Sequence, residues 1–304
     1  MKLLITGASG LLGLNLSLAE METRTIVGVD RSKLVNTPFE LIKADLLDPD
    51  VEHHILDLVK PDAVIHTAAN ANVDSCELDP AGARLLNAEL PGELADACAK
   101  RGIRMIHLST DAVFDGTQKA AYTETDEPNP LGVYAQTKLD GERAVLSANP
   151  QAIVARVNFF GWSLSGRRSL GEFFVNNLSE GRNVNGFTNV IFCPMWVNHL
   201  SRTLVEMLEK DLHGLYHVVG AQPMSKYQFG VEVARKFGLN ESLIAPQSVE
   251  MSSLTAKRSH NLWLSVHKLS TALGHEIPSF STGLDGFYTQ FQQGYPQKIR
   301  SYQQ

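Results

Sequence analysis

Short apolar segments alternate with longer amphipathic segments along the first 160 residues of the chain. The apolar segments that read as buried strands lie at 2–6, 24–30, 41–46, 63–69, 103–109 and 152–157. Between them, stretches such as Pro80 to Arg101 have the spacing of helices that bury one face. Because parallel strands need long crossover connections, this alternation predicts an α/β fold with a doubly wound parallel sheet.

The pattern becomes less regular in the second half of the chain. Residues 187–210 are expected to bring the chain back to the sheet. The segment 213–219 and the helix after Ser225 look like parts of a smaller lobe. We therefore predict a first domain over 1–157 and a second lobe that takes up most of 158–304, with no proline-rich or serine-rich linker between them.

Glycines at a fixed spacing follow the first apolar segment. Gly7, Gly10 and Gly13 form a G-x-x-G-x-x-G pattern that contains Ser9 and Leu11. Glycines at such places permit a tight turn, a close approach of backbone N–H groups to a pyrophosphate, and close packing of the next helix. The start of that helix adds partial positive charge. We therefore predict a dinucleotide-binding loop in preference to an ordinary glycine loop. A signal peptide is also disfavoured, because polar residues interrupt what would be its apolar core.

Two acidic residues are placed to contact the adenosine half of such a cofactor. Asp30 ends the second predicted strand, 23 residues beyond Gly7, where a carboxylate accepts hydrogen bonds from ribose hydroxyls. That position favours NAD(H), whereas the guanidinium of Arg31 fits the 2′-phosphate of NADP(H), so the sequence leaves the preference open. Asp45 and Leu46, at the end of the third predicted strand, are expected at the adenine edge.

Small and polar residues near the next strand ends complete the predicted cofactor site. Ala68 and Ala69 end the fourth predicted strand, and their small side chains let a cofactor lie against the backbone. Asn87, in the middle of the following helix, and Ser109, at the end of the fifth strand, are further candidates. His66 lies within an apolar run, which favours a core histidine over a catalytic one.

Composition and charge narrow the range of partners. The 304 residues carry a net charge of −6, which argues against a nucleic acid or an anionic membrane as the main partner. No apolar stretch approaches the ~20 residues that span a bilayer. Cys76, Cys98 and Cys193 are widely spaced and lack neighbours at metal-ligand offsets, so we expect no metal site, no disulfide framework and a cytoplasmic location.

Hydroxyl groups and a lysine are placed to act at the carboxyl end of the fifth strand. That strand ends in Ser109 and Thr110, and a proline-rich loop leads to Tyr134 and Lys138. Residues four apart lie on one face of a helix, so the phenol and the ammonium can share a site. There Lys138 is expected to lower the pKa of Tyr134 and to hold a ribose, while Thr110 polarises a substrate carbonyl. This set predicts hydride transfer with Tyr134 as the proton donor, and Tyr134 and Lys138 also contact the cofactor.

These motifs together resemble those of the dTDP-4-dehydrorhamnose reductase family, which belongs to the extended short-chain dehydrogenase/reductases with a Rossmann fold. The resemblance covers residues 1 to about 160 and rests on the glycine pattern at 7–13, Ser109 to Gly116, Tyr122 to Pro130, Tyr134 to Lys138 with Gly141-Glu142, Asp74 with Glu77, and Asn87-Ala88 ahead of Pro91-Gly92. It implies that Thr110, Tyr134 and Lys138 are catalytic. It further implies that 1–157 binds NAD(P)(H) and that the lobe after it mostly binds a nucleotide sugar.

The resemblance also implies candidate substrate contacts, which are Asp111, Ala112, Phe160, Trp162 and Arg258. The family usually has tyrosine where this chain has Ala112, which leaves the identity of the sugar open. Related 4,6-dehydratases carry glutamate there, and since alanine moves no proton, reduction without dehydration is favoured. We therefore predict an NAD(P)H-dependent oxidoreductase, similar to the enzyme of dTDP-rhamnose biosynthesis, that reduces the 4-keto group of a nucleotide-linked deoxysugar.

Two other functions are compatible with the same residues. The beta subunit of methionine adenosyltransferase resembles these reductases, so a cofactor-binding regulatory subunit without turnover is one alternative. A nucleotide-sugar epimerase that retains NAD is the other. The leading hypothesis predicts a nucleotide sugar as the small-molecule partner and allows a homodimer.

Overall fold

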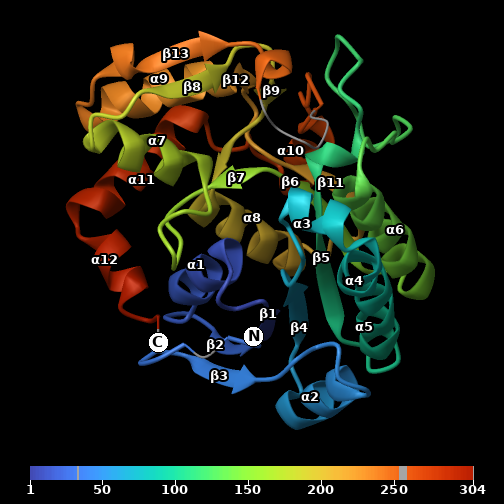
Figure 1. The fold of residues 1–304 in the computed structure, drawn as a ribbon. Coiled ribbons are helices and arrows are strands. Elements are labelled where there is room, and N and C mark those ends of the chain that lie inside the picture. Colours follow the sequence, from blue (N-terminus) through green and yellow to red (C-terminus); the bar gives the residue numbers. More distant parts are fainter. Residues whose placement is uncertain (33, 253–258, 304) are drawn as a thin grey trace.

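A parallel sheet forms the centre of the molecule (Figure 1). The computed structural model describes residues 1–32, 34–252 and 259–303, and within these ranges the seven strands of this sheet follow the order β3-β2-β1-β4-β5-β6-β11. Their bounds are β1 Lys2–Thr6, β2 Thr25–Asp30, β3 Glu40–Lys43, β4 Ala63–His66, β5 Arg104–Thr110, β6 Ile153–Val157 and β11 Gly214–Val218. The order reverses between β1 and β4, as in a doubly wound sheet, so the predicted fold class is confirmed.

Helices cover both faces of the sheet, and β1 contributes side chains to both. Leu3 and Ile5 belong to one apolar cluster with α1 (Leu11–Glu20) and α8 (Val197–Glu209), whereas Leu4 belongs to a second cluster on the other face. The helices of the second cluster are α2 Val51–Val59, α5 Leu90–Ala99 and α6 Val133–Ala148. Successive side chains of a strand point to opposite faces, so burial on both faces requires the uninterrupted apolar run that β1 has.

The segment predicted as one helix from Pro80 to Arg101 is divided. The short helix α3 (Val73–Leu78) comes before it, and α4 (Pro80–Arg84) is separated from α5 by a π turn over Leu85–Glu89. A π turn holds an extra residue, which changes the direction in which its side chains point. Asn87, inside this turn, is completely buried and contacts both the loop after β4 and α6.

The second lobe consists of short strands and helices beyond β6. Its strands pair two by two, as β7 Phe159–Phe160 with β10 Met195–Trp196, β9 Ile191–Phe192 with β12 Met224–Ser225, and β8 Val184–Phe187 with β13 Ile244–Gln247. Its helices are α7 Leu170–Ser179, α9 Lys226–Phe237, α10 His267–Leu273, α11 Phe280–Gln292 and α12 Tyr295–Arg300. Throughout the described ranges, no helix combines the length and the apolar character needed to cross a bilayer.

The chain returns to the main sheet later than the sequence predicts. Residues 187–210 form short strands outside that sheet and then α8, which packs beside α1. The returning strand is β11, which comes from the segment 213–219 predicted for the smaller lobe and pairs in parallel with β6. These two predictions were wrong because a short apolar strand has the same pattern whichever sheet it joins.

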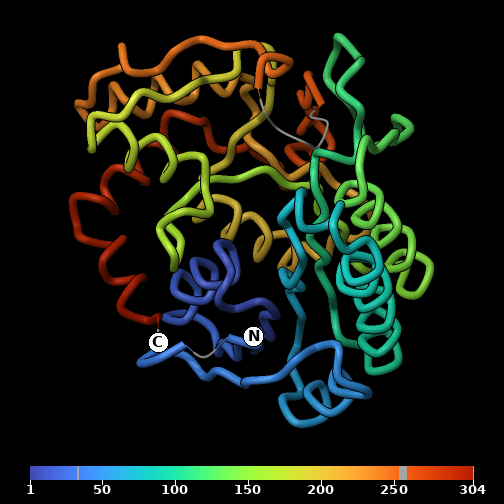
Figure 2. The backbone as a smooth tube through the Cα atoms, viewed as in Figure 1, coloured from blue at the N-terminus to red at the C-terminus, as the bar shows by residue number. Residues whose placement is uncertain are grey.

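The end of the described chain lies against the first domain. In Figures 1 and 2, α12 runs from the second lobe toward β2 and β3. The backbone N–H of Val35 donates a hydrogen bond to the carbonyl oxygen of Tyr302 at 2.9 Å, and Leu34 forms an antiparallel bridge with Gln303. The loop that follows β2 is therefore held by residues from the opposite end of the chain.

Candidate active site

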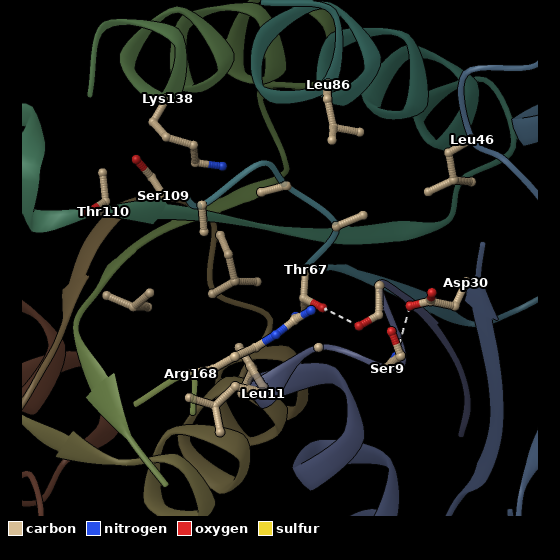
Figure 3. Close-up of a pocket in the computed structure, with 18 of the residues that line it drawn as sticks. Ser9, Leu11, Asp30, Leu46, Thr67, Leu86, Ser109, Thr110, Lys138 and Arg168 are labelled. Carbon is tan, nitrogen blue, oxygen red and sulfur yellow. Dashed lines mark hydrogen bonds between the residues drawn. The ribbon is translucent and has the colours of Figure 1, made fainter. Parts of the chain in front are cut away.

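An open cavity of about 480 Å³ lies at the carboxyl ends of the central strands. The loops that follow β1, β2, β4 and β5 line it together with one face of α6. It lies where the strand order reverses, which is the place where doubly wound sheets bind ligands. Figure 3 shows Ser9 and Asp30 at one end of the cavity and Thr110 and Lys138 at the other.

The glycines predicted to bind phosphate form a turn that larger residues would not fit. Gly7 has a φ of +70°, and a Cβ there would lie 2.8 Å from the backbone of Ala68. A Cβ on Gly13 would lie 2.3 Å from the carbonyl oxygen of Gly7. Gly10 is the N-cap of α1 and has no side chain to satisfy the first N–H groups of that helix, which suits a pyrophosphate. The loop residues that line the cavity are Gly7, Ser9, Gly10 and Leu11.

The residues predicted for the adenosine half meet at one end of the cavity. The carboxylate of Asp30 accepts hydrogen bonds from the backbone N–H groups of Ser9 and Ser32, both at 2.8 Å. A guanidinium nitrogen of Arg31 lies 3.8 Å from a carboxylate oxygen of Asp45 in an exposed ion pair. The predicted residues that line this end are Asp30, Arg31, Asp45 and Leu46. Because it holds both a carboxylate and a guanidinium, the preference between NAD(H) and NADP(H) stays open.

The loop after β4 forms one wall of the cavity. Ala68 and Ala69 line it, whereas Asn87 is not among the described lining residues. The side chain of Asn87 accepts a hydrogen bond from the backbone N–H of Asn70 at 2.8 Å and donates one to the Asn70 carbonyl at 3.0 Å. Asn87 therefore holds this wall in place and does not contact the cavity itself.

Thr110, Tyr134 and Lys138 meet at the other end of the cavity. Thr110 ends β5, while Tyr134 and Lys138 lie one turn apart on α6. Burial raises the pKa of Tyr134 to about 12, and a hydrogen bond with Thr110 offsets part of that rise. Tyr134 therefore keeps its proton at neutral pH, which is the form that a proton donor requires.

The expected lowering of the Tyr134 pKa by Lys138 is wrong for the protein alone. Burial is the main cause of the shift, and Lys138 is not among the groups that contribute to it. The Nζ of Lys138 lies 3.4 Å from Nε2 of His107. Burial lowers the pKa of Lys138 to about 8, against an opposing effect of Glu142. The ammonium thus has an imidazole partner inside the protein, and it stays mostly protonated at pH 7.

Two buried histidines lie next to Lys138. The rings of His66 and His107 stack with centroids 5.5 Å apart, and the hydroxyl of Thr6 lies 2.7 Å from Nδ1 of His66. Burial lowers the pKa of both imidazoles, that of His66 to about 3, so both are neutral. A neutral Nε2 on His107 accepts a hydrogen bond from the Lys138 ammonium. His66 itself is a core residue, as the sequence predicted.

A buried ion pair lies behind the end of the cavity where Thr110 and Lys138 lie. Arg156 on β6 forms a two-pronged interaction with Glu142 on α6, with nitrogen–oxygen distances of 2.9 and 2.7 Å. The carboxylate of Glu142 also accepts a hydrogen bond from the hydroxyl of Ser109. Ser109 lines the cavity, but its hydroxyl is engaged in this contact. The pair therefore fixes the end of β5 against α6, one turn beyond Lys138.

Asp111 is a predicted substrate contact that the structure brings into the cavity. Its carboxylate accepts hydrogen bonds from the side-chain amide of Asn158 at 2.6 Å and from the hydroxyl of Thr110 at 3.2 Å. Burial raises its pKa to about 6. A carboxyl group that titrates near neutrality beside Thr110 is suited to bind a sugar hydroxyl.

The other predicted substrate contacts lie elsewhere. Ala112 is half-buried in a 3-10 turn and is not among the described residues that line the cavity. Phe160 and Trp162 are each 1% exposed within the apolar core. Trp162 stacks on Phe287 at 4.1 Å between centroids, and its indole N–H donates to a backbone carbonyl, so both aromatic residues are packing residues and not substrate contacts. Arg258 lies outside the described residues.

The cavity also includes residues that the sequence reasoning did not single out. Thr67 follows β4, Leu86 lies in the π turn, and Arg168 lies in the loop before α7. No motif marks these positions. Arg168 in particular is one of two adjacent arginines with the appearance of a solvated loop pair, so only the fold distinguishes it from Arg167.

Comparison with known protein families identifies the group to which this site belongs. The family described as RmlD substrate binding domain matches residues 1–293. The chain belongs to this RmlD family. The resemblance that the motifs predicted is therefore confirmed, and it extends well beyond the first 160 residues.

Relatives that are similar to the chain over nearly its whole length carry different names. The probable low-salt glycan biosynthesis reductase Agl14 of Haloferax volcanii is 31% identical over 284 residues, which are 92% of this chain and 95% of that protein. A dTDP-4-dehydrorhamnose reductase of Aggregatibacter actinomycetemcomitans is 30% identical over 290 residues, 90% and 93% of the two chains. The methionine adenosyltransferase 2 subunit beta of Mus musculus is 33% identical over 305 residues, 93% and 86% of the two chains.

Solved structures of similar proteins share the fold. A hypothetical dTDP-4-dehydrorhamnose reductase of Sulfolobus tokodaii has a TM-score of 0.82 and 30% identity, and the match covers 94% of this chain and 99% of that one. The dTDP-4-dehydrorhamnose reductase of Bacillus anthracis, solved in complex with NADP, has a TM-score of 0.85 at 23% identity, covering 95% and 99%. The match to the RmlD family and the shared structure confirm the predicted family and its Rossmann fold, and several of these relatives are named as reductases.

Proposed function

We propose that this chain reduces the 4-keto group of a nucleotide-linked deoxysugar with NADH or NADPH. The observation that carries the proposal is that Thr110, Tyr134 and Lys138 line the same cavity as the glycine loop that follows β1. The reductases among the relatives support the substrate class, since one is named a probable glycan biosynthesis reductase and another a dTDP-4-dehydrorhamnose reductase.

The residues of the cavity fit a dinucleotide along its length. Gly10 and Leu11 would hold the pyrophosphate, and Asp30 or Arg31 the adenosine ribose. Lys138 would hold the nicotinamide ribose. When bound, the reduced nicotinamide supplies the hydride.

The protein's own groups would then bind and protonate the substrate oxygen. The hydroxyl of Thr110, which donates to Asp111 in the protein alone, would turn to donate a hydrogen bond to the carbonyl oxygen, where negative charge develops during reduction. Tyr134, which its raised pKa keeps protonated, donates its proton to that oxygen. An alkoxide is a stronger base than a phenolate, so this transfer is favourable. Asp111, beside Thr110, would orient the sugar through a neighbouring hydroxyl.

Substitution of Tyr134 tests the proposed chemistry. Wild-type protein with dTDP-4-dehydrorhamnose should consume NADPH or NADH, followed as loss of absorbance. Tyr134→Phe should lower kcat by about 10²- to 10⁴-fold, since it removes a general acid. Binding of the dinucleotide, measured by fluorescence, should change little. Tyr288→Phe, which removes a phenol on α11 away from the cavity, is the matched control. The faster cofactor shows whether Asp30 or Arg31 governs the preference.

A second candidate function rests on the similarity to methionine adenosyltransferase 2 subunit beta. A regulatory subunit would bind the dinucleotide, reduce no nucleotide sugar and associate nearly stoichiometrically with a partner enzyme. If wild type and Tyr134→Phe bind the cofactor equally and neither oxidises it, the reductase proposal for this sugar fails. An epimerase would instead retain NAD tightly and show no net consumption of NADH.

A further inference from the structure

The loop between β7 and α7 has a fixed backbone. The completely buried carboxylate of Glu172 accepts hydrogen bonds from the backbone N–H groups of Ser163, Arg168 and Ser169, at 2.6, 3.0 and 3.2 Å. In return, the side chain of Ser169 caps the first turn of α7. Because buried partners satisfy this backbone, the loop presents its side chains from a defined position.

Arg168 is the residue of this loop that reaches the cavity. Its side chain is exposed and lines the cavity, and Figure 3 shows it extending past Leu11 toward the side where Ser9 and Thr67 lie. Among the residues that the structure describes, no carboxylate forms an ion pair with its guanidinium. Arg167 is also exposed but is not among the described residues that line the cavity.

The charges along the cavity differ between its two ends and its middle. Lys138 lies at the catalytic end, and Arg31 at the adenosine end is paired with Asp45. Between these ends, the start of α1 contributes only backbone N–H groups and the partial positive charge of the helix. Arg168 adds a full positive charge in this middle part. A guanidinium fork matches the oxygens of phosphate groups, and a pyrophosphate carries negative charge on both phosphates.

We propose that Arg168 binds the pyrophosphate of the dinucleotide from beside the glycine loop. The proposal rests on the dinucleotide part of the proposed function and is independent of the sugar. It gives the second lobe a direct contact with the cofactor, because Arg168 lies beyond β7 while the glycine loop belongs to the first domain. The pyrophosphate is then held by both a helix start and a cationic side chain.

Binding measurements without substrate test this assignment. Dissociation constants for NADPH and for NADH are measured by fluorescence titration of wild type, Arg168→Gln and Arg167→Gln. Arg168→Gln should weaken both dinucleotides by about tenfold, since it removes a charge-assisted hydrogen bond, and should reduce the dependence of binding on salt. Arg167→Gln should leave both constants unchanged, and Arg168→Lys should restore part of the affinity. Thermal melts of each variant check that folding is intact.

Other outcomes would overturn the assignment in distinct ways. Weaker binding of NADPH with unchanged NADH would place Arg168 at the 2′-phosphate. Unchanged dinucleotide affinity with weaker binding of dTDP alone would place it at the diphosphate of the substrate. Equal constants in wild type and Arg168→Gln for every probe would leave it a solvated cation. If wild type bound neither dinucleotide, the proposal that the cavity binds NAD(P)(H) would be wrong too. If wild type bound a dinucleotide but did not reduce the keto sugar, the reductase proposal would fail and this binding test would still hold.

Discussion

At the scale of single residues, Asp111 is buried and accepts a hydrogen bond from the hydroxyl of Thr110. Its side chain is 4% exposed, and burial raises its pKa from the ordinary 3.8 to about 6. A carboxyl group whose pKa is higher in the folded state than in the unfolded state stabilises the fold while it is protonated. That contribution is complete below about pH 4 and is lost as the pH rises through about 6.

Replacement of Asp111 should therefore change the pH dependence of stability. At each pH we take the free energy of unfolding of Asp111→Asn minus that of wild type. This difference should be larger at pH 8 than at pH 5 by roughly 1 kcal/mol, because wild type carries a buried charge at pH 8 and the variant does not. Urea titrations at the two pH values measure this difference. Asp126→Asn is the control, since a backbone hydrogen bond from Thr123 lowers the pKa of that carboxyl group, which is therefore ionised at both pH values. A difference that is the same at pH 5 and pH 8 would contradict the prediction.

Residues whose role depends on local spacing are the ones that the sequence predicts well. Thr110 ends a strand, and Tyr134 and Lys138 share a helix face, so their meeting follows from two short segments and the fold class. The direction of the Tyr134 pKa shift depends on burial, which distant segments decide, and the prediction was wrong there. Arg168 was missed for the same reason.

At the scale of elements, the contact between the π turn and α6 organises one wall of the cavity. Gly141 of α6 lies so close to the turn that an added Cβ would be 2.2 Å from the carbonyl oxygen of Asn87. Asn87 in turn holds Asn70 and donates a hydrogen bond to Thr137 of α6 at 3.2 Å. The periodicity predicts a helix here but not its interruption, because the π turn arises from this packing and leaves no sequence signal of its own.

Gly141→Ala should push α6 away from the π turn. We expect a loss of about 3 kcal/mol in the free energy of unfolding, at the upper end for overpacked sites, because the added methyl group meets backbone and not a flexible side chain. The affinity for the dinucleotide should fall with it, since the wall that Asn87 holds would move. Urea titration and fluorescence binding measure the two effects. Ser147→Ala, at an exposed position on the same helix, is the control and should change the free energy of unfolding little. A Gly141→Ala protein as stable as wild type would contradict the close contact between α6 and the π turn.

At the scale of the whole molecule, the two lobes share one core. The apolar cluster that contains Leu3 of β1 also contains Leu204 of α8 and Phe287 of α11. Strand β11 completes the sheet by pairing with β6, although the segment from β7 to α8 separates these two strands in the chain. The sequence predicts the strands of the first domain and their parallel order from local patterns, but the origin of the last strand depends on long-range pairing that such patterns do not encode.

A fragment of residues 1–157 should therefore not fold on its own. It lacks the β11 strand that covers the edge of β6 and the α8 helix that packs on α1, so part of its core would face water. Circular dichroism during heating should show a broad change without a cooperative transition. The full chain, heated under the same conditions, is the reference, and it should unfold in one step. A fragment that melts cooperatively near the temperature of the full chain would instead support two independent domains.

The pairing of Tyr302 with Val35 has a consequence for protein engineering. On the proposed function, the cofactor preference would depend on Asp30 and Arg31 at the end of β2, and an exchange of the loop that follows them would be the direct way to change it. The same loop is a docking site for the other end of the described chain, through the hydrogen bond between Val35 and Tyr302. Because this bond joins backbone atoms, a loop grafted from another dinucleotide-binding protein keeps the docking contact only if it places a backbone N–H where that of Val35 lies, whatever its side chains are.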